Sequence, residues 1–400
     1  MTRAAASRPA ILFYSQHSVG LGHLVRSLSI AGALAERFRV VLVSGGTIPK
    51  TITVPTGVEL VALAPIGSRG GADTSLASLT PGLSIEEAWE RRLTTLLDLF
   101  DVVGPVALLV ELFPLGRRKF AREVVPLLEH ARAARGARGA PTIVCSVRDI
   151  LVTGGRDQGA KDNEATLRLN HYFDAVLVHG DPTVIRLEDT FRPTVELRVP
   201  VHYTGYVVPR RERPRATPTG QPEVLVSAGG GKVGAGLLRS AALAHERHLA
   251  DRGLRTRIVT GPFLDDEEVR ALESISANAP GLHIERFIPD LASAMASASA
   301  SISQCGYNTA LDIVRSGVPS VVVPHDEGRE TEQAERARRL AALGVVRVLD
   351  SSELTPRHLA DEVLGLLGAD RSHAVIDLDG ARTSARLVAE LVGAGSAMHG

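Results

Sequence analysis

The segment from Ser301 to Leu340 constrains the fold of this 400-residue chain more than any other. It contains a glycine turn at Gly306, an amphipathic stretch that ends at Gly317, an apolar run over 318–324, and a polar loop before a second amphipathic stretch. A short apolar run of this kind is typical of a parallel strand that is covered on both faces. Helix, buried strand and helix in succession predict an α/β domain with a doubly wound parallel sheet.

Polar residues gather on either side of this predicted strand. Asn308 and Thr309 follow the glycine turn, where we expect their side chains to accept hydrogen bonds from the first amides of the helix. The loop from His325 to Thr331 has four charged residues among seven, and Glu332 and Gln333 begin the next helix. Open α/β sheets bind ligands beyond the carboxyl ends of their strands, so these residues are candidate ligand contacts.

This pattern resembles the donor site of nucleotide-sugar glycosyltransferases. The resemblance consists of Gly306 with an acid six residues later at Asp312, then Gly317-Val318-Pro319, Pro324, and the Glu332-Gln333 pair. The type is that of glycosyltransferase family 28, which has the GT-B fold and includes the N-acetylglucosaminyl transferase that makes lipid II. The resemblance implies that Asp312 holds the ribose of the donor and that the acid/amide pair holds its sugar. An aspartate here replaces the commoner glutamate.

Composition narrows the class of protein. Forty-five basic and 45 acidic residues give a formal net charge of zero, which argues against a nucleic-acid binder. The two cysteines, Cys145 and Cys305, are too few for a disulfide framework or a metal set. No apolar run approaches the ~18 residues of a membrane-spanning helix. The apolar run at residues 10–14 is too short for the hydrophobic core of a secretion signal. We expect a cytosolic protein without a membrane span, and we leave peripheral membrane contact open.

The amino-terminal half begins with a βαβ unit. A strand over 10–14 leads through a glycine loop into a helix that ends near Phe38, and a second strand follows over 39–44. Gly20-Leu21-Gly22 lets the backbone approach an anion at the start of that helix, and His23 lies on its first turn. This loop resembles that of the same transferases, and more closely that of UDP-sugar hydrolases on the same fold, whose histidine is a general base. His23 is therefore the first candidate base.

Glu111 is the second candidate base. It follows a buried strand over 105–110, and Arg117 lies six residues further on. A carboxylate at a strand end beside arginines is typical of a functional site, but an ion pair between Glu111 and Arg117 explains the same pattern. His179 and Asp181 also follow a strand, as ordinary strand-to-helix caps do.

The carboxyl-terminal half repeats the pattern. A strand over 223–227 leads into a glycine loop over 228–235. The loop does not predict NAD binding, because the strand over 256–260 ends without an acid, and it is not a Walker loop, because Lys232 precedes a valine. The resemblance implies that it holds a diphosphate, and that Ile288 lies over the base of the nucleotide.

The expected fold is GT-B, with two Rossmann-like parallel-sheet domains. The boundaries are 1–205 for an acceptor-side domain, 206–222 for a proline- and arginine-rich linker, 223–380 for a UDP-sugar-binding domain, and 381–400 for a helix that crosses back and a tail. The candidate catalytic residues are His23 and Glu111. The candidate substrate-binding residues are Gly20, Gly22, Gly229, Gly230, Gly231, Lys232, Gly234, Ile288, Gly306, Asn308, Thr309, Asp312, His325, Glu332 and Gln333.

Three functions fit this pattern. The first is an inverting glycosyltransferase that moves a sugar, N-acetylglucosamine or another hexose, from a UDP-sugar to an unidentified acceptor. The second is a UDP-sugar hydrolase or epimerase, and the third is a nucleotide-sugar-binding protein without turnover. We expect no cofactor besides the donor substrate and no metal.

Overall fold

The computed structural model describes residues 8–17, 22–49, 52–67, 75–134, 140–151, 157–209, 214, 220–231, 233–325 and 331–397. The chain divides into two compact units. The N-terminal unit comprises the described residues of Met1–Leu151, Arg156–Arg210 and Asp377–Gly400, and the C-terminal unit comprises those of Arg211–Ile376. Residues from both ends of the chain therefore contribute to the N-terminal unit.

The N-terminal unit contains a seven-stranded parallel sheet in the order β3-β2-β1-β6-β7-β8-β9. Its strand order reverses between β1 and β6, which is where an open α/β sheet forms a crevice for a ligand. A separate antiparallel pair is formed by β4 (Ile66–Gly67) and β5 (Ala77–Ser78). The strands of the large sheet are β1 (Ala10–Ser15), β2 (Arg39–Ser44), β3 (Val58–Ala62), β6 (Ala107–Glu111), β7 (Thr142–Arg148), β8 (Ala175–His179) and β9 (Val201–Tyr203).

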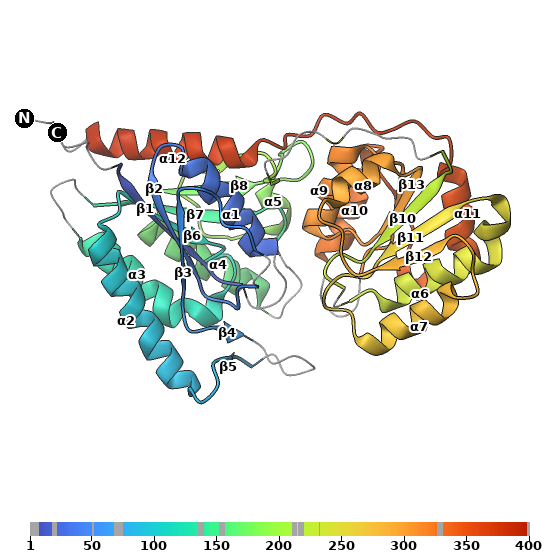
Figure 1. Cartoon of the computed structure of the whole chain (residues 1–400). Helices are drawn as coiled ribbons and strands as arrows, with labels where there is room; N and C mark the ends of the chain where they lie inside the picture. Colours follow the sequence, from blue (N-terminus) through green and yellow to red (C-terminus); the bar gives the residue numbers. More distant parts are fainter. Residues whose placement is uncertain are drawn as a thin grey trace, which may run out of the picture. The chain divides into compact units, whose positions relative to one another are not determined.

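Helices cover both faces of this sheet (Figure 1). Alternate residues of β1 show the two layers, because Ile11 and Phe13 pack in a core with α1 and α12, whereas Leu12 and Tyr14 pack in a core with α2 and α3. The helices of this unit are α1 (Gly22–Leu34), α2 (Ile85–Val103), α3 (Ala121–Ala133), α4 (Gln158–Tyr172), α5 (Leu187–Thr190) and α12 (Gly380–Ala397), with a 3₁₀ turn at Arg118–Phe120.

A buried hydrogen-bond network lies at the carboxyl ends of the strands of this sheet. Arg92 of α2 is fully buried, and its Nε and Nη2 atoms donate to the two carboxylate oxygens of Glu123 in α3, at 2.7 and 2.6 Å. The same guanidinium donates to the carbonyl oxygens of Gly45 and Ala64, both at 2.8 Å, and to the Gln16 side chain at 2.7 Å. One arginine thus joins two helices to the loops that follow β1, β2 and β3.

The C-terminal unit contains a six-stranded parallel sheet in the order β12-β11-β10-β13-β14-β15, with its switch point between β10 and β13. The strands are β10 (Glu223–Ser227), β11 (Arg255–Val259), β12 (Leu282–Glu285), β13 (Ala300–Ser303), β14 (Ser320–Val322) and β15 (Arg347–Val348). The helices are α6 (Ala235–Ala244), α7 (Asp266–Ser276), α8 (Leu291–Ser297), α9 (Tyr307–Ser316), α10 (Glu332–Ala342) and α11 (Pro356–Leu366), with one π turn at His245–Leu249 and 3₁₀ turns at Ala250–Arg252 and Ser351–Glu353.

The two parallel sheets confirm the expected fold class. Gly317 ends α9 in the left-handed conformation with φ of 65°, as its place in the sequence predicts. The predicted strand over 318–324 is longer than β14, which comprises Ser320–Val322, although Pro319 and Val323 on either side of it also hydrogen-bond to β13.

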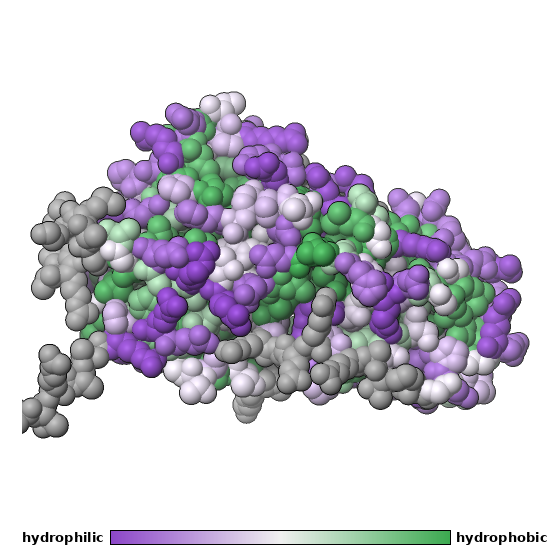
Figure 2. Space-filling view, turned by 90° about the horizontal axis from the view of Figure 1, so that it is seen from above, coloured by the Kyte–Doolittle hydropathy of each residue, from purple (hydrophilic) through white to green (hydrophobic). Residues whose placement is uncertain are grey.

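No helix in the described part of the chain is long and apolar enough to cross a membrane. Figure 2 shows hydrophilic residues over most of one face, with smaller hydrophobic areas between them. This mixture agrees with the balanced composition of the sequence.

Candidate active site

His23 and Glu111 form a hydrogen-bonded pair at the switch point of the N-terminal sheet. His23 is the second residue of α1, and Glu111 is the last residue of β6, the strand that pairs with β1. The His23 Nδ1 atom lies 2.7 Å from Glu111 Oε1. The imidazole remains 14% exposed, whereas the carboxylate is fully buried. A buried carboxylate therefore orients a histidine that solvent can reach.

The charges around Glu111 fix the protonation of this pair. Burial favours a raised pKa for the Glu111 carboxyl, but His23, Arg26 and Arg117 together lower that pKa to about 2. Because an ionised carboxylate only accepts hydrogen bonds, Nδ1 of His23 carries the proton and Nε2 carries the lone pair. Burial also lowers the pKa of His23, although Glu111 partly opposes this shift. The histidine is thus neutral at about pH 7 and can accept a proton on Nε2.

Arg26 is a direct ion-pair partner of Glu111, a contact that the sequence did not predict. The Arg26 guanidinium contacts the same carboxylate oxygen as His23 does, and its side chain is only 3% exposed. It reaches Glu111 because Arg26 lies one turn after His23 on α1. Arg117 contributes through its charge, which lowers the pKa of both Glu111 and His23. Arg26 was in the sequence motif but carried no role in the prediction.

The glycine loop of the C-terminal unit is tightly packed between β10 and α6. Gly229 and Gly231 have φ of 62° and 82°, and Gly234 has φ of 119° as the N-cap of α6, which has no side-chain cap. A Cβ atom on Gly231 would overlap the carbonyl oxygen of Thr260. The loop therefore requires glycine, and it leads into a helix N-terminus that favours an anion. These are the properties expected of a diphosphate loop.

Residues after β13 lie against this glycine loop. The Thr309 hydroxyl is 3.5 Å from the position that a Cβ on Gly229 would take, and the Gln304 amide is 3.2 Å from that of Gly234. Gln304 is 8% exposed and was not predicted as a site residue. A polar residue between a buried strand and a glycine turn is the signal that could have identified it. The switch point between β10 and β13 thus brings two predicted motifs together.

The capping role expected of Asn308 and Thr309 is wrong. The N-cap of α9 is Gly306, which makes no side-chain cap, so Asn308 and Thr309 are the second and third residues of the helix. Asp312 lies further along α9 with its side chain 24% exposed, and Arg315 Nη1 is 3.8 Å from its carboxylate. The Asp312 carboxylate is thus accessible to solvent, as a ribose contact would have to be.

The acid/amide pair of α10 is held by partners within the C-terminal unit. Glu332 Oε1 accepts a hydrogen bond from Arg336 Nη2 at 2.7 Å, and the Glu332 side chain is 14% exposed. The Gln333 side-chain oxygen accepts from the backbone amide of His325 at 3.0 Å. A ligand would therefore meet Gln333 through its NH₂ group, while His325 contributes its backbone to shaping the loop. The sequence did not predict these internal partners.

Exposed apolar residues flank the glycine loop on the side of β11 and β12. Ile288 is partly buried, and the adjacent Phe287 is 67% exposed. Phe263 is 47% exposed, its amide donates to the Gly230 carbonyl at 3.0 Å, and its ring is 3.4 Å from the Cβ position of Gly230. Phe263 was missed because one aromatic residue in a loop has no periodicity to mark it.

Two predicted residues, Gly20 and Lys232, lie outside the described residues. Gly22 is the first residue of α1, directly before His23.

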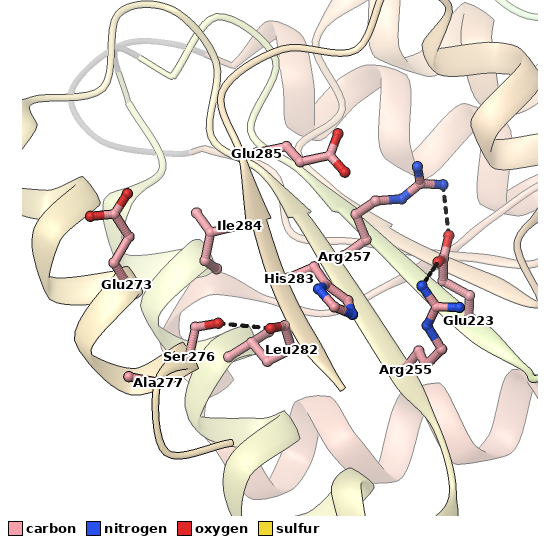
Figure 3. Close-up of a pocket in the computed structure, with 10 residues that line it drawn as sticks. All are labelled: Glu223, Arg255, Arg257, Glu273, Ser276, Ala277, Leu282, His283, Ile284 and Glu285. Carbon is pink, nitrogen blue, oxygen red and sulfur yellow. Dashed lines mark hydrogen bonds and ion pairs between the residues drawn. The ribbon is translucent and has the colours of Figure 1, made fainter. Parts of the chain in front are cut away.

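A separate hollow of about 510 Å³ lies on the C-terminal unit. Glu223, Arg255 and Leu282, the first residues of β10, β11 and β12, contribute to it. Figure 3 shows the guanidinium groups of Arg255 and Arg257 beside Glu223, with Arg257 Nη2 at 2.7 Å from its carboxylate. The hollow extends from the first residues of these strands along β12 to Glu285, and the described residues that line it include none of the glycine loop. It is therefore not part of the candidate active site.

Residues 225–375 match the family model for the glycosyltransferase family 28 C-terminal domain. The chain is 28% identical over 189 residues to the UDP-N-acetylglucosamine–N-acetylmuramyl-(pentapeptide) pyrophosphoryl-undecaprenol N-acetylglucosamine transferase of Mesorhizobium japonicum. That match covers 46% of this chain and 50% of the relative, so the chain spans about half the length of that curated relative. The protein of the same name from Methylorubrum extorquens is 23% identical over 386 residues, covering 93% of this chain and 95% of the relative.

Solved structures show the same fold. MurG of Acinetobacter baumannii has a TM-score of 0.59 at 17% identity and covers 96% of this chain and 100% of that chain. The calicheamicin glycosyltransferase CalG4 has a TM-score of 0.58 at 19% identity and covers 98% and 95% of the two chains. These likenesses confirm the GT-B fold predicted from the sequence.

Proposed function

We propose that the protein transfers a sugar from a UDP-sugar to an acceptor, because residues 225–375 match the glycosyltransferase family 28 C-terminal domain and the chain has a GT-B fold. The family match carries the proposal because it includes the glycine loop, Asp312 and the Glu332-Gln333 pair. The donor sugar that we propose is N-acetylglucosamine or another hexose. The two relatives described above, which this chain matches over 50% and 95% of their lengths, are named as N-acetylglucosamine transferases.

The C-terminal unit is proposed to hold the donor. The uncapped N-terminus of α6 and the loop of Gly229–Gly231 suit a diphosphate, because helix N-termini favour anions without a mobile side chain. Asp312 would accept hydrogen bonds from the ribose, and Ile288 with Phe263 would contact the base. Glu332 and the NH₂ group of Gln333 would hold hydroxyls of the sugar.

The N-terminal unit is proposed to supply the base. In inverting transfer, the acceptor oxygen attacks the anomeric carbon, the acceptor proton passes to a base, and UDP leaves with the electron pair of the glycosidic bond. The neutral His23 is suited to accept that proton on Nε2, and Glu111 is suited to hold the imidazole in this tautomer and to stabilise the imidazolium that forms. Glu111 is then a positioning residue, because a carboxyl with a pKa of about 2 is a weak base.

Product analysis tests the reaction. The purified protein is incubated with UDP-glucose, UDP-N-acetylglucosamine and UDP-galactose, with and without a small-molecule cell extract, and the products are identified by mass spectrometry. Transfer predicts UDP release and a new glycosylated compound only with the extract. A UDP-sugar hydrolase would release free sugar without it, and an epimerase would yield an isomeric UDP-sugar. Binding without any product would indicate a nucleotide-sugar-binding protein.

Replacement of His23 tests the mechanism. Because general base catalysis contributes ~10²–10⁴-fold, we expect His23→Ala to lower kcat by about that factor with little change in the donor KM. His171→Ala is the matched control, since His171 is an exposed histidine on α4 of the same unit. If His23→Ala keeps normal turnover and Glu111→Gln abolishes it, the base is Glu111 instead.

A further inference from the structure

Arg336 is a buried arginine that joins the two halves of the proposed donor site. Its side chain is 2% exposed, in the second turn of α10. One terminal nitrogen, Nη2, donates to Glu332 Oε1 at 2.7 Å, and the other, Nη1, donates to the backbone oxygen of Cys305 at 3.0 Å. Its guanidinium carbon also lies 5.5 Å from the centre of the Tyr307 ring. The arginine thus contacts α10 and the turn between β13 and α9 at once.

These contacts act on the residues that the proposed function assigns to the donor. Cys305 and Tyr307 flank Gly306, the N-cap of α9, and α9 carries Asp312. Glu332 is the acid proposed to hold the sugar. Because the planar guanidinium makes two contacts in fixed directions, it sets the Glu332 carboxylate relative to the α9 turn. A glutamate on a free helix end would instead sample several rotamers, and a bound sugar would have to order it.

The depth of Arg336 excludes a direct role with substrate. A side chain that is 2% exposed does not reach a ligand in the site, so any effect on the donor passes through Glu332 or through the α9 turn. Arg338, two residues further on, offers a comparison on the same helix, because it is 67% exposed and pairs with Glu335 one turn earlier.

We infer that Arg336 is a positioning residue that holds the Glu332 carboxylate in place for the sugar of the donor. The inference rests on the proposed function, since it takes Glu332 as a sugar contact. The role inferred for Arg336 concerns binding of the sugar and not binding of the nucleotide. Loss of Arg336 is therefore expected to lower the affinity for a UDP-sugar more than the affinity for UDP, because UDP has no donor sugar for Glu332 to contact.

The experiment compares UDP, UDP-glucose and UDP-N-acetylglucosamine by titration calorimetry on the full chain. Arg336→Met removes the charge and keeps an apolar stem in the buried position. Arg336→Lys keeps the charge but replaces the planar fork with a single ammonium group. Arg338→Met makes the same chemical change at an exposed position of the same helix. The melting temperature of every variant is measured, so that a loss of folding is recognised.

We expect Arg336→Met to weaken binding of the UDP-sugar that the wild type prefers by about 10-fold or more, the usual effect of losing a charge-assisted hydrogen bond. UDP affinity should change less than about threefold, Arg336→Lys should recover part of the loss, and Arg338→Met should leave both affinities unchanged. In a Glu332→Gln background, Arg336→Met should add little, because the two residues act as one unit.

Three results would overturn the inference. Arg336→Met could weaken the binding of UDP and of the UDP-sugar equally, or it could bind the UDP-sugar with wild-type affinity. The losses of UDP-sugar affinity caused by Arg336→Met and Glu332→Gln could also add fully in the double variant. A failure of the proposed function is recognised separately, since a wild-type protein that binds neither UDP nor any UDP-sugar would exclude the donor site itself. If Arg336→Met does not fold, the comparison is decided by Arg336→Lys.

Discussion

At the residue scale, the two members of the His23–Glu111 pair have different proposed roles, His23 as the base and Glu111 as the residue that positions it. Glu111 is buried and held by Arg26, and its pKa of about 2 keeps it ionised near neutral pH. His23 titrates closer to neutrality, but burial lowers its pKa from the ordinary ~6.5. A base is active only when it is unprotonated. Activity should therefore persist at pH values where an exposed histidine is already charged.

This pair leads to a prediction about pH dependence. The acid limb of kcat/KM is expected below pH ~6.5, because the lowered pKa keeps His23 neutral to lower pH. Glu111 raises the pKa of His23, so Glu111→Gln should move the limb to still lower pH, while kcat falls by ~10²–10⁴-fold because the tautomer is no longer fixed. Rate profiles from about pH 4 to pH 9 measure both effects. Glu59→Gln, at an exposed glutamate of β3, is the control. A limb that moves to higher pH would contradict the assigned roles.

Single residues also show what the sequence could and could not predict. His23 and Glu111 were both candidates from sequence, since each follows a strand and the GLGH loop has a family resemblance. Their relation was not predicted, because the hydrogen bond spans 88 residues and depends on β6 lying beside β1. The role of Arg26 was not predicted for the same reason, since Glu111 lies 85 residues from it. Arg336 was missed because its burial and its contact with Cys305, 31 residues away, depend on the fold. The Glu111–Arg117 ion pair was an alternative explanation of the sequence pattern, and in the structure the charge of Arg117 helps to lower the pKa of Glu111.

At the element scale, the glycine loop before α6 depends on close backbone contacts. Gly261, in the loop after β11, has φ of 84°, and a Cβ there would lie 2.5 Å from the Gly229 oxygen. The backbones of the two loops are therefore in direct contact at these glycines. The sequence predicted the loop from its spacing. It did not predict Gly261 as the partner, because that contact comes from the β10–β11 pairing rather than from a motif.

Alanine substitutions within this element test the loop. Gly231→Ala is expected to weaken UDP binding by at least 10-fold, because φ of 82° and the Thr260 oxygen both exclude a side chain, so the loop must move. Gly236→Ala, on the first turn of α6, is the matched control, since no atom lies within 4 Å of its Cβ position. It should bind UDP normally and be more stable by about 0.5–1 kcal/mol. Calorimetry and urea unfolding measure both variants. Equal UDP affinity in the two would show that this loop does not hold the nucleotide.

The Arg92 network makes the corresponding prediction for the N-terminal unit. Arg92→Leu would leave Glu123 buried without its main counter-charge, so we expect a loss of about 3–5 kcal/mol in the free energy of unfolding. Arg91→Leu is the control, because Arg91 is the exposed neighbour on α2. Adding Glu123→Leu to Arg92→Leu should restore part of the stability, since no charge then stays buried. Urea unfolding measures the wild type, both single variants Arg92→Leu and Glu123→Leu, the double variant and the Arg91→Leu control. A double variant as unstable as the sum of the two single variants would contradict the ion-pair explanation.

At the scale of the whole molecule, the two units have separate sheets and separate cores. The sequence predicted two βαβ-built halves because the pattern of glycine loop, helix and buried strand occurs twice. It could not order the strands within each sheet, since periodicity identifies a strand without its neighbours, and that order comes from the structure. The contribution of α12 to the N-terminal unit likewise followed from resemblance, because an amphipathic helix does not indicate which sheet it covers.

Two separate cores lead to a prediction about where UDP stabilises the chain. A ligand stabilises only the cooperative unit that binds it, by about 2.7 kcal/mol at a concentration 100 times its Kd. Amides of β10 and β13 that exchange only when the C-terminal unit unfolds should therefore exchange about 100-fold more slowly with UDP. Amides of β1 and β6 should keep their rates, because the proposed UDP contacts all lie in the other unit. Hydrogen exchange with mass spectrometry on the full chain measures both sets, and Gly231→Ala with the same UDP is the control. Equal slowing in both units would contradict the placement of the nucleotide in the C-terminal unit alone.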